Sequence, residues 1–149
     1  MKIPISVLVV IYKSNRDVLL IERADRSGFW QSVTGSLDAP DEDLALAAAR
    51  EVFEETGISV DHLPKGALQN MHQQIEYEIY PEWRFRYGPG VTRNTEHWFA
   101  LEVPGNTPIT LAPREHVAYE WLPYKEAAKK CFSRSNGEAI LKLFSGNKE

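Results

Sequence analysis

A run of β-branched and other apolar residues near the start of the chain restricts the possible folds more than any other segment. Residues 5–12 read Ile-Ser-Val-Leu-Val-Val-Ile-Tyr, and a second such run at residues 18–21 follows the polar turn 13–16. Two β-rich runs joined by a short polar turn predict a β-hairpin. The whole apolar stretch, residues 3–12, is far shorter than the ~20 residues that a membrane span needs. We therefore expect a buried strand here.

A short strand and one long helix follow the hairpin. Residues 31–34 predict the strand, which should end at Gly35, and Asp41 is the expected N-cap of a helix over residues 42–56. Gly57 should end that helix. At 100° per residue, the predicted core face of the helix consists of Ala45, Ala48, Ala49 and Val52.

The second half of the chain predicts mainly strands and ends in helical segments. Alternating polar and apolar residues, broken by Pro and Gly, predict strands at residues 75–79, 83–87, 98–103 and 118–122. Short helices are expected at residues 124–131 and 135–144. A mostly β core that carries a few helices is typical of an α/β or α+β fold, and we expect a single domain over residues 1–149.

Composition excludes several classes of protein. The formal net charge of −4 provides no basic surface for a nucleic-acid backbone, so nucleic acid is not an expected partner. The single cysteine, Cys131, cannot form an intramolecular disulfide, which argues against a disulfide-stapled secreted scaffold. With no predicted membrane span either, we expect a cytoplasmic protein.

The long helix carries three glutamates where a stable helix would favour cations. Glu51, Glu54 and Glu55 are spaced i, i+3 and i+4, so they share one face. They lie in the last turns, where the helix dipole disfavours each anion by about 0.3–1 kcal/mol. A solvated acidic face is one interpretation. The other is a site for a hard divalent cation, Mg²⁺ or Mn²⁺, which prefers oxygen ligands.

The segment around these glutamates resembles the Nudix box, G-x5-E-x7-R-E-U-x-E-E-x-G-U, where U is a bulky aliphatic residue. Gly35, Glu42 and the run Arg50-Glu51-Val52-Phe53-Glu54-Glu55-Thr56-Gly57-Ile58 match its specified positions. One loop differs, because six residues instead of five separate Gly35 from the first acid. We assign that acid to Glu42 rather than Asp41, since a loop accepts an extra residue more easily than a helix does.

The resemblance implies an enzyme that hydrolyses nucleoside diphosphates linked to a further group, with bound divalent metal and water attack at phosphorus. It also implies a Nudix-like α/β/α sandwich with a mixed sheet. Glu51, Glu54 and Glu55 are similar to the metal ligands of that family, Arg50 to the residue that orients a box glutamate, and Glu42 to its salt-bridge partner.

Further stretches resemble one Nudix subfamily, the pyrophosphohydrolases of dihydroneopterin triphosphate and dATP. They are residues 29–36, 86–96, 115–119 and 133–136, and the similarity extends over residues 2–143. The resemblance implies cleavage of this triphosphate to the monophosphate and pyrophosphate, a step in folate synthesis. Glu115 then matches a further metal ligand or base.

The same resemblance implies a set of contacts to a small-molecule triphosphate. The matching positions are Lys2, Arg23, Thr34, Tyr77, Tyr80 and Ser133. Lys2 and Arg23 would supply cations for the phosphates, and Tyr77 or Tyr80 a flat partner for the ring. Tyr77 has an alternative interpretation as a core residue of an alternating strand. Arg84, Arg86 and Arg93 line the site or lie on a solvated strand face.

Other functions stay open at this stage. A different Nudix hydrolase, acting on other nucleoside triphosphates or on dinucleoside polyphosphates, would carry the same box. A silent nucleotide-sensing domain usually loses box glutamates, and this chain retains all of them. A structural module with a solvated acidic helix is the third alternative. The sequence leaves open the preferred base, the number of metal ions and the oligomeric state.

Overall fold

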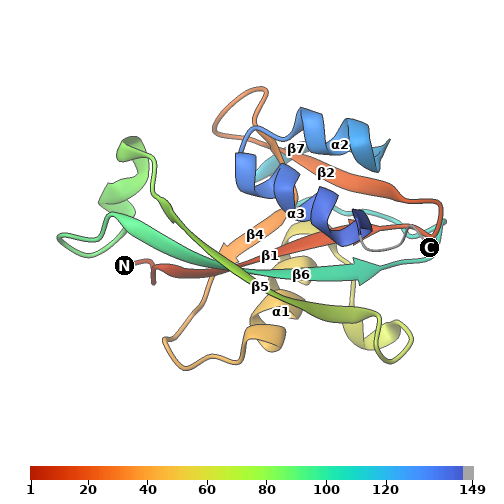
Figure 1. The fold of residues 1–149 in the computed structure, drawn as a ribbon, viewed down its shortest axis with the longest axis horizontal. Helices are drawn as coiled ribbons and strands as arrows, with labels where there is room; N and C mark the ends of the chain where they lie inside the picture. Colours follow the sequence, from red (N-terminus) through yellow and green to blue (C-terminus); the bar gives the residue numbers. More distant parts are fainter. Residues whose placement is uncertain (146–149) are drawn as a thin grey trace.

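A mixed sheet of seven strands forms the centre of the computed structural model, which describes residues 1–145 (Figure 1). Its strands are β1 (Ile5–Tyr12), β2 (Asp17–Arg23), β3 (Trp30–Gln31), β4 (Val33–Ser36), β5 (Leu68–Glu78), β6 (Arg93–Glu102) and β7 (His116–Pro123). The order is β3-β2-β1-β6-β5, with β4 paired to β1 and β7 to β2. Strand β1 runs parallel to β6 and antiparallel to β2 and β4.

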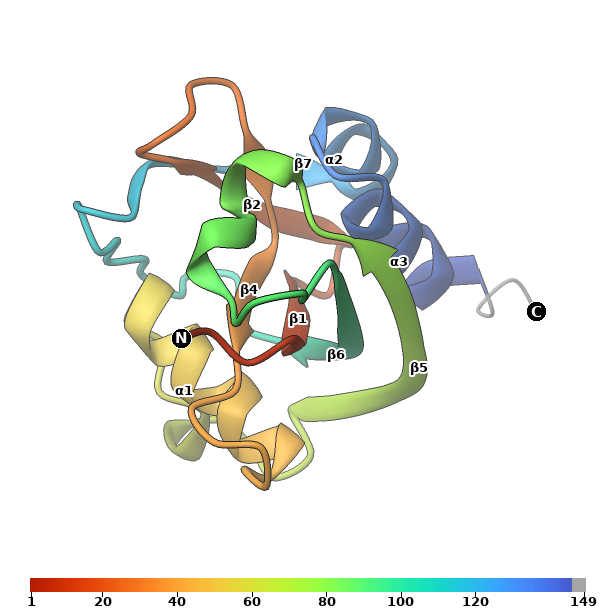
Figure 2. The same cartoon turned by 90° about the vertical axis from the view of Figure 1, so that its left-hand side faces the viewer.

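Helices cover both faces of the sheet (Figure 2). They are α1 (Leu44–Thr56), α2 (Tyr124–Lys130) and α3 (Arg134–Ser145), accompanied by the short 3-10 helices η1 (Val60–His62) and η2 (Pro81–Arg86). Alternate residues of β1 serve the two layers: Val7 and Val9 pack in one core with Val52 of α1, while Leu8 and Val10 share the other with helices α2 and α3. The predicted α/β/α sandwich with a mixed sheet is therefore confirmed. None of the helices within residues 1–145 has the length and apolar character that a membrane crossing requires.

Most elements form where the sequence patterns predict them. The hairpin of residues 5–12 and 18–21 is confirmed, with Tyr12 opposite Val18. Gly57 ends α1 with a φ of 77°, a left-handed conformation that glycine adopts without strain. The two C-terminal helices also form.

The start of α1 differs from the prediction. Asp43, not Asp41, is the N-cap, and its side chain accepts a hydrogen bond of 3.1 Å from the backbone N–H of Leu46. Glu42 thus precedes the helix and belongs to the loop, where its carboxylate has other partners. Asp41, Glu42 and Asp43 are three consecutive acids, so the sequence alone does not single out the cap. In the structure, Glu42 instead binds Arg50 and the Asp38 N–H.

The buried face of α1 is also rotated relative to the prediction. Ala45 is exposed, whereas Ala47 is buried together with Ala48 and Val52. Glu51 and Glu55 lie on the buried side as well. The alanine pattern alone could not reveal this phase, because it depends on the carboxylates facing the sheet.

Two predicted strands were wrong in detail. Residues 83–86 form part of η2 instead of a strand, since Pro81 begins a tight turn in which the Trp83 N–H donates to the Tyr80 carbonyl. Tyr87 caps this helix and forms an isolated bridge with Lys2. The Arg84 side chain closes this turn on the Ile79 carbonyl at 3.0 Å. Residues 31–34 are divided between β3 and β4, and Gly35 lies inside β4 rather than after it.

Candidate functional site

The C-terminal half of α1 turns two glutamates toward strand β4. Glu51 is 9% exposed and Glu55 only 3% exposed. Gly35 of β4 makes this approach possible, because a Cβ atom built there would overlap the Glu51 carboxylate. Strand pairing holds Gly35 in place opposite Val7 of β1. The carboxylates of Glu51 and Glu55 thus pack against β4 at Gly35, and we call this arrangement the carboxylate cradle.

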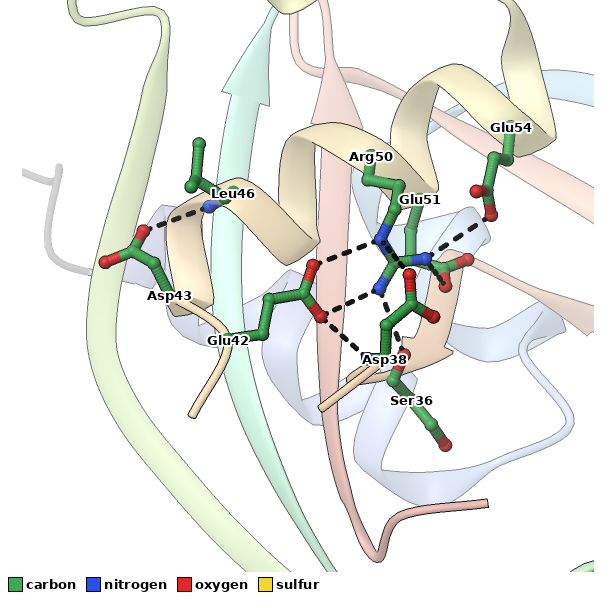
Figure 3. Close-up of polar contacts among 8 residues, drawn as sticks. All are labelled: Ser36, Asp38, Glu42, Asp43, Leu46, Arg50, Glu51 and Glu54. Atoms are coloured by element: carbon green, nitrogen blue, oxygen red, sulfur yellow. Dashed lines mark hydrogen bonds and ion pairs between the residues drawn. The ribbon is translucent and has the colours of Figure 1, made fainter. Parts of the chain in front are cut away.

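Arg50 links the loop before α1 to the carboxylates on the helix (Figure 3). Its guanidinium donates two hydrogen bonds of 3.1 Å to Glu42 and one of 2.8 Å to Glu51. A further bond of 3.2 Å reaches the Ser36 carbonyl, and Glu54 lies 3.5 Å away. The predicted pairing of Glu42 with Arg50 is confirmed. Glu42 also accepts from the Asp38 N–H at 2.7 Å, which closes the loop that contains the extra residue.

The electrostatics of this cluster follow from burial and from Arg50. Burial raises the pKa of Glu51 and raises that of Glu55 well above its ordinary value, with repulsion between the two acids as a further cause for Glu55. The charge of Glu115 is a further cause of the raised pKa of Glu55. Hydrogen bonds from Arg50 instead lower the pKa of Glu42.

The residues of the cradle suit a hard metal ion. The buried Oε1 of Glu55 has no hydrogen-bond partner, and all the candidate ligands are carboxylates. Within residues 1–145, no three His, Cys, Asp or Glu side chains already converge on one point, and Arg50 forms ion pairs with Glu51 and Glu54. Oxygen ligands with excess negative charge are the donors that Mg²⁺ and Mn²⁺ prefer.

The carboxylates line a pocket of about 730 Å³. Cationic and polar side chains line this pocket as well. Its lining includes Lys2, Arg23, Gln31, Thr34, Arg86, Asn94, Arg114 and His116. In Figure 2, the elements around it, which are the N-terminal segment, β4, α1 and η2, lie at the end of the molecule that faces the viewer.

A second pocket of about 530 Å³ adjoins the first. The two share Lys2, Arg23, Gln31, Thr34, Tyr77, Arg86 and Tyr87 as lining residues. Aromatic side chains dominate one part of the second pocket: Phe29 and Tyr80 both pack on Trp83, with ring centroids 5.7 and 5.3 Å apart. The combined space therefore has a carboxylate end and an aromatic end.

The sequence-predicted site residues meet in these two pockets, except Arg50 and its partner Glu42. Glu51, Glu54, Glu55 and Glu115 line the first; Tyr80 and Ser133 line the second; Lys2, Arg23, Thr34 and Tyr77 line both. Arg50 lines neither pocket and contacts the carboxylates from the side. Of the three arginines left open, Arg86 lines both pockets, whereas Arg93 pairs with Glu76 on the strand surface.

Two of the cations are already partly engaged. Arg23 forms a 2.7 Å ion pair with Asp25, and its guanidinium lies 4.6 Å from the centre of the Trp83 ring. Arg86 reaches the same Asp25 at 3.5 Å. Partial burial lowers the pKa of Lys2, and the charges of Arg86 and Arg23 lower it further. These cations repel one another, and an anionic ligand among them would relieve that repulsion.

Sequence reasoning missed several polar residues of the pockets. Asn94 and Glu96 are buried on β6, and Asn136 is buried on α3. Asn94 donates to the Ser6 hydroxyl at 2.7 Å and to the Tyr77 hydroxyl at 3.1 Å. The sequence did contain one signal. Asn94, Glu96 and Trp98 occupy every second position of one strand, so two polar side chains share a face with a core tryptophan.

Comparison with known proteins identifies the family to which this chain belongs. The family profile described as NUDIX domain matches residues 2–143. The dihydroneopterin triphosphate diphosphatase of Escherichia coli K12 is 45% identical over 140 residues, which cover 93% of this chain and 91% of that protein. The protein of the same name from Haemophilus influenzae is 40% identical over 138 residues, covering 92% and 85%.

A solved structure agrees with this relationship. The structure of the Escherichia coli dihydroneopterin triphosphate pyrophosphohydrolase matches with a TM-score of 0.88 and 43% identity, over 97% of both chains. The chain therefore belongs to the Nudix family, and the expectation of a Nudix hydrolase, an enzyme acting on phosphoric anhydrides, is confirmed. Nudix hydrolases generally use divalent metal ions and act on small phosphate compounds.

Proposed function

We propose that this chain hydrolyses dihydroneopterin triphosphate to dihydroneopterin monophosphate and pyrophosphate. The relatives from Escherichia coli and Haemophilus influenzae carry that substrate in their names, and their similarity extends over nearly the whole chain. In the reaction, water attacks phosphorus and the bond between the α-phosphorus and the bridging oxygen breaks. Pyrophosphate leaves with that oxygen.

The proposal rests mainly on the observation that the two pockets adjoin and share lining residues. A substrate with a triphosphate at one end and a flat bicyclic ring at the other needs a charged space continuous with an aromatic one. The first pocket, which contains the carboxylates, and the second, aromatic pocket share Lys2, Arg23 and Arg86. These cations are suited to binding phosphates that lie between the two pockets. The ring would then lie beside Tyr77, Tyr80 and Ser133.

Glu51, Glu54, Glu55 and Glu115 are the residues that would hold the divalent metal, and Mg²⁺ is the ion that we propose. A bound metal of this kind lowers the pKa of water and neutralises phosphate charge. The role of Arg50 is to position Glu51 through its 2.8 Å hydrogen bond, with Glu42 fixing the guanidinium in turn.

The test is a substrate panel with identified products. Purified protein is incubated with dihydroneopterin triphosphate, the four common dNTPs and a dinucleoside polyphosphate, with and without Mg²⁺. We expect the highest kcat/KM for the pterin compound, release of pyrophosphate and dependence on the metal. A preference for a pyrimidine or a dinucleoside polyphosphate, or release of orthophosphate, would refute the proposal while leaving membership of the family intact.

We propose dATP as a weaker substrate. Adenine and the pterin are both flat bicyclic rings, so the aromatic pocket can stack either one. A hydrogen bond that one ring makes and the other leaves unmade would cost roughly 1–3 kcal/mol of transition-state binding. The same panel measures this ratio.

A further inference from the structure

One buried acid in the aromatic pocket has no part in the carboxylate cradle. Glu96 of β6 is 2% exposed, lines the second pocket and is absent from the lining of the first. Its carboxylate accepts a hydrogen bond of 3.0 Å from the indole N–H of Trp98. Strand pairing places Ile75 of β5 and Ser6 of β1 opposite it, so neighbouring strands on both sides hold its backbone.

Glu96 lacks the compensation that buried acids usually have. Among residues 1–145, no lysine, arginine or histidine forms an ion pair with it. A carboxylate offers about four lone-pair sites, and the side chains of Trp98 and Ser135 are donors to two of them. Burial accordingly raises the pKa of Glu96, which means that the fold retains this acid at a cost in stability.

Neighbouring polar groups of the pocket are less available to a ligand. The Asn136 Oδ1 already accepts from the backbone N–H of Ser32 at 2.8 Å, and the hydroxyls of Ser133 and Ser135 lie 3.1 Å from each other. The Tyr77 hydroxyl accepts from Asn94. Strand pairing sets Ile75 opposite Glu96 and Tyr77 opposite Asn94, so Tyr77 and Glu96 share one face of neighbouring strands and line the same pocket. A ring beside Tyr77 would therefore meet the Glu96 carboxylate at its edge.

We propose that Glu96 is a specificity-determining residue, whose carboxylate accepts hydrogen bonds from the two adjacent N–H donors of a 2-amino-4-oxopyrimidine edge. This inference rests on the proposed function, because the pterin ring of dihydroneopterin triphosphate carries that edge. Its ring N–H and its exocyclic amino group point the same way, as the two oxygens of a carboxylate do. Such paired, charge-assisted hydrogen bonds are the strong ones in proteins.

The same carboxylate discriminates against adenine. The adenine edge offers one donor, its amino group, beside one acceptor, the ring nitrogen, and an ionised carboxylate would face that acceptor with a second acceptor. A glutamine amide has one acceptor and one donor, which is the pattern that pairs with adenine. Replacing Glu96 by Gln should therefore change the ring preference and not merely weaken binding.

The experiment compares wild-type protein with Glu96→Gln and with the control Glu102→Gln. Glu102 is an exposed glutamate at the end of the same strand and lines neither pocket. For Glu96→Gln, we expect kcat/KM for dihydroneopterin triphosphate to fall roughly 10- to 100-fold, mainly through KM, while that for dATP is unchanged or higher. The control should retain the wild-type ratio of the two substrates.

The outcomes separate the two proposals. If the wild-type protein does not hydrolyse the pterin triphosphate, the proposed function fails. If it does and Glu96→Gln leaves the ratio unchanged, or lowers both activities equally, the role of Glu96 is overturned. Should Glu96→Gln fail to fold, Glu96→Asp keeps the charge but withdraws it from the ring, so the pterin activity should fall without any gain for dATP. A proportional loss for both substrates in that variant would also overturn the proposal.

Discussion

Buried glutamates are the most informative single residues of this chain. An acid is rarely buried without a paired cation, because desolvation of its charge destabilises the fold. Glu51 meets this requirement through Arg50, whereas the Oε1 of Glu55 has no hydrogen-bond partner. Such a residue contributes little to the stability of the metal-free protein, so its presence indicates a function.

The first prediction concerns Glu55 and Glu51. Glu55→Gln and Glu51→Gln should each lower turnover by orders of magnitude, because each removes a proposed metal ligand. The metal-free stability should stay the same or rise, since repulsion between like charges is relieved. Steady-state kinetics together with thermal unfolding in EDTA tests this. Near-wild-type turnover in both variants would contradict the proposed site.

The second prediction is a pH dependence of stability due to Glu96. Burial raises its pKa above the ordinary value of 4.5, so the folded protein binds this proton more tightly than the unfolded chain does. The corresponding stability is fully present below pH 4.5 and is lost as the pH rises through the raised pKa. Relative to the wild type, Glu96→Gln should thus gain in Tm from pH 4.5 toward neutral pH.

Thermal unfolding of both proteins between about pH 4 and 8 measures that difference. Glu102→Gln serves again as the control on the same strand, and its Tm difference from the wild type should change less with pH. A Tm difference for Glu96→Gln that is flat, or that shrinks as the pH rises, would contradict the assignment.

Among the elements, α1 and the loop before it carry most of the carboxylate site. The loop is one residue longer than the Nudix box specifies, and Glu42 closes it by binding both Arg50 and the Asp38 N–H. Asp41 is exposed and precedes the helix without capping it. The two neighbouring acids therefore provide a matched pair for testing the loop.

The third prediction is that Glu42→Ala reduces activity more than Asp41→Ala. Without Glu42, Arg50 loses two hydrogen bonds of 3.1 Å, and its hold on Glu51 becomes less well oriented. Asp41→Ala leaves these contacts in place. The check is kcat/KM for both variants at saturating Mg²⁺. If Asp41→Ala were the more damaging change, the pairing that the structure contains would not be the one used in catalysis.

Elements also differ in how far their sequence determines them. Strand β1 and the glutamate spacing of α1 could be predicted because both depend on local periodicity. The rotated face of α1 could not, since it depends on Gly35 of a different element receiving Glu51. The η2 turn was mistaken for a strand because Trp83 and Phe85 alternate with arginines, as strand residues do. Pro81 and the capture of the Ile79 carbonyl by Arg84 determine the outcome there.

The pocket residues also divide into those that the sequence could predict and those that it could not. Glu51, Glu54 and Glu55 are found together because one helix carries them, and the resemblance to a family supplied distant positions such as Lys2 and Ser133. Glu96 and Asn136 come from β6 and α3, which approach each other only in the folded sandwich. Local pattern alone contains no information about such pairs.

Across the whole molecule, the sandwich brings the two halves of the site together at one end. Helix α1, on one face of the sheet, supplies the carboxylates, while α3, on the other face, contributes to the aromatic pocket. Strand β4 and the N-terminal segment lie between them. Because the proposed ligands of a metal at this site come from α1 and from the loop before β7, we expect metal binding to be coupled to the stability of the entire fold.

The last prediction uses this coupling. A ligand that binds only the folded state stabilises it by about 2.7 kcal/mol at 100 times its Kd, which for a chain of this size corresponds to roughly 5–10 °C in Tm. We expect Mg²⁺ or Mn²⁺ to raise the Tm of the wild-type protein in this way, in a concentration-dependent manner. Glu55→Gln should lose most of that increase, whereas the control Glu102→Gln should keep it. Monovalent salt at equal ionic strength distinguishes binding from general screening of the negative charge. An equal Tm increase in wild type and Glu55→Gln would mean that the metal binds elsewhere, and the buried carboxylates would then need a different explanation.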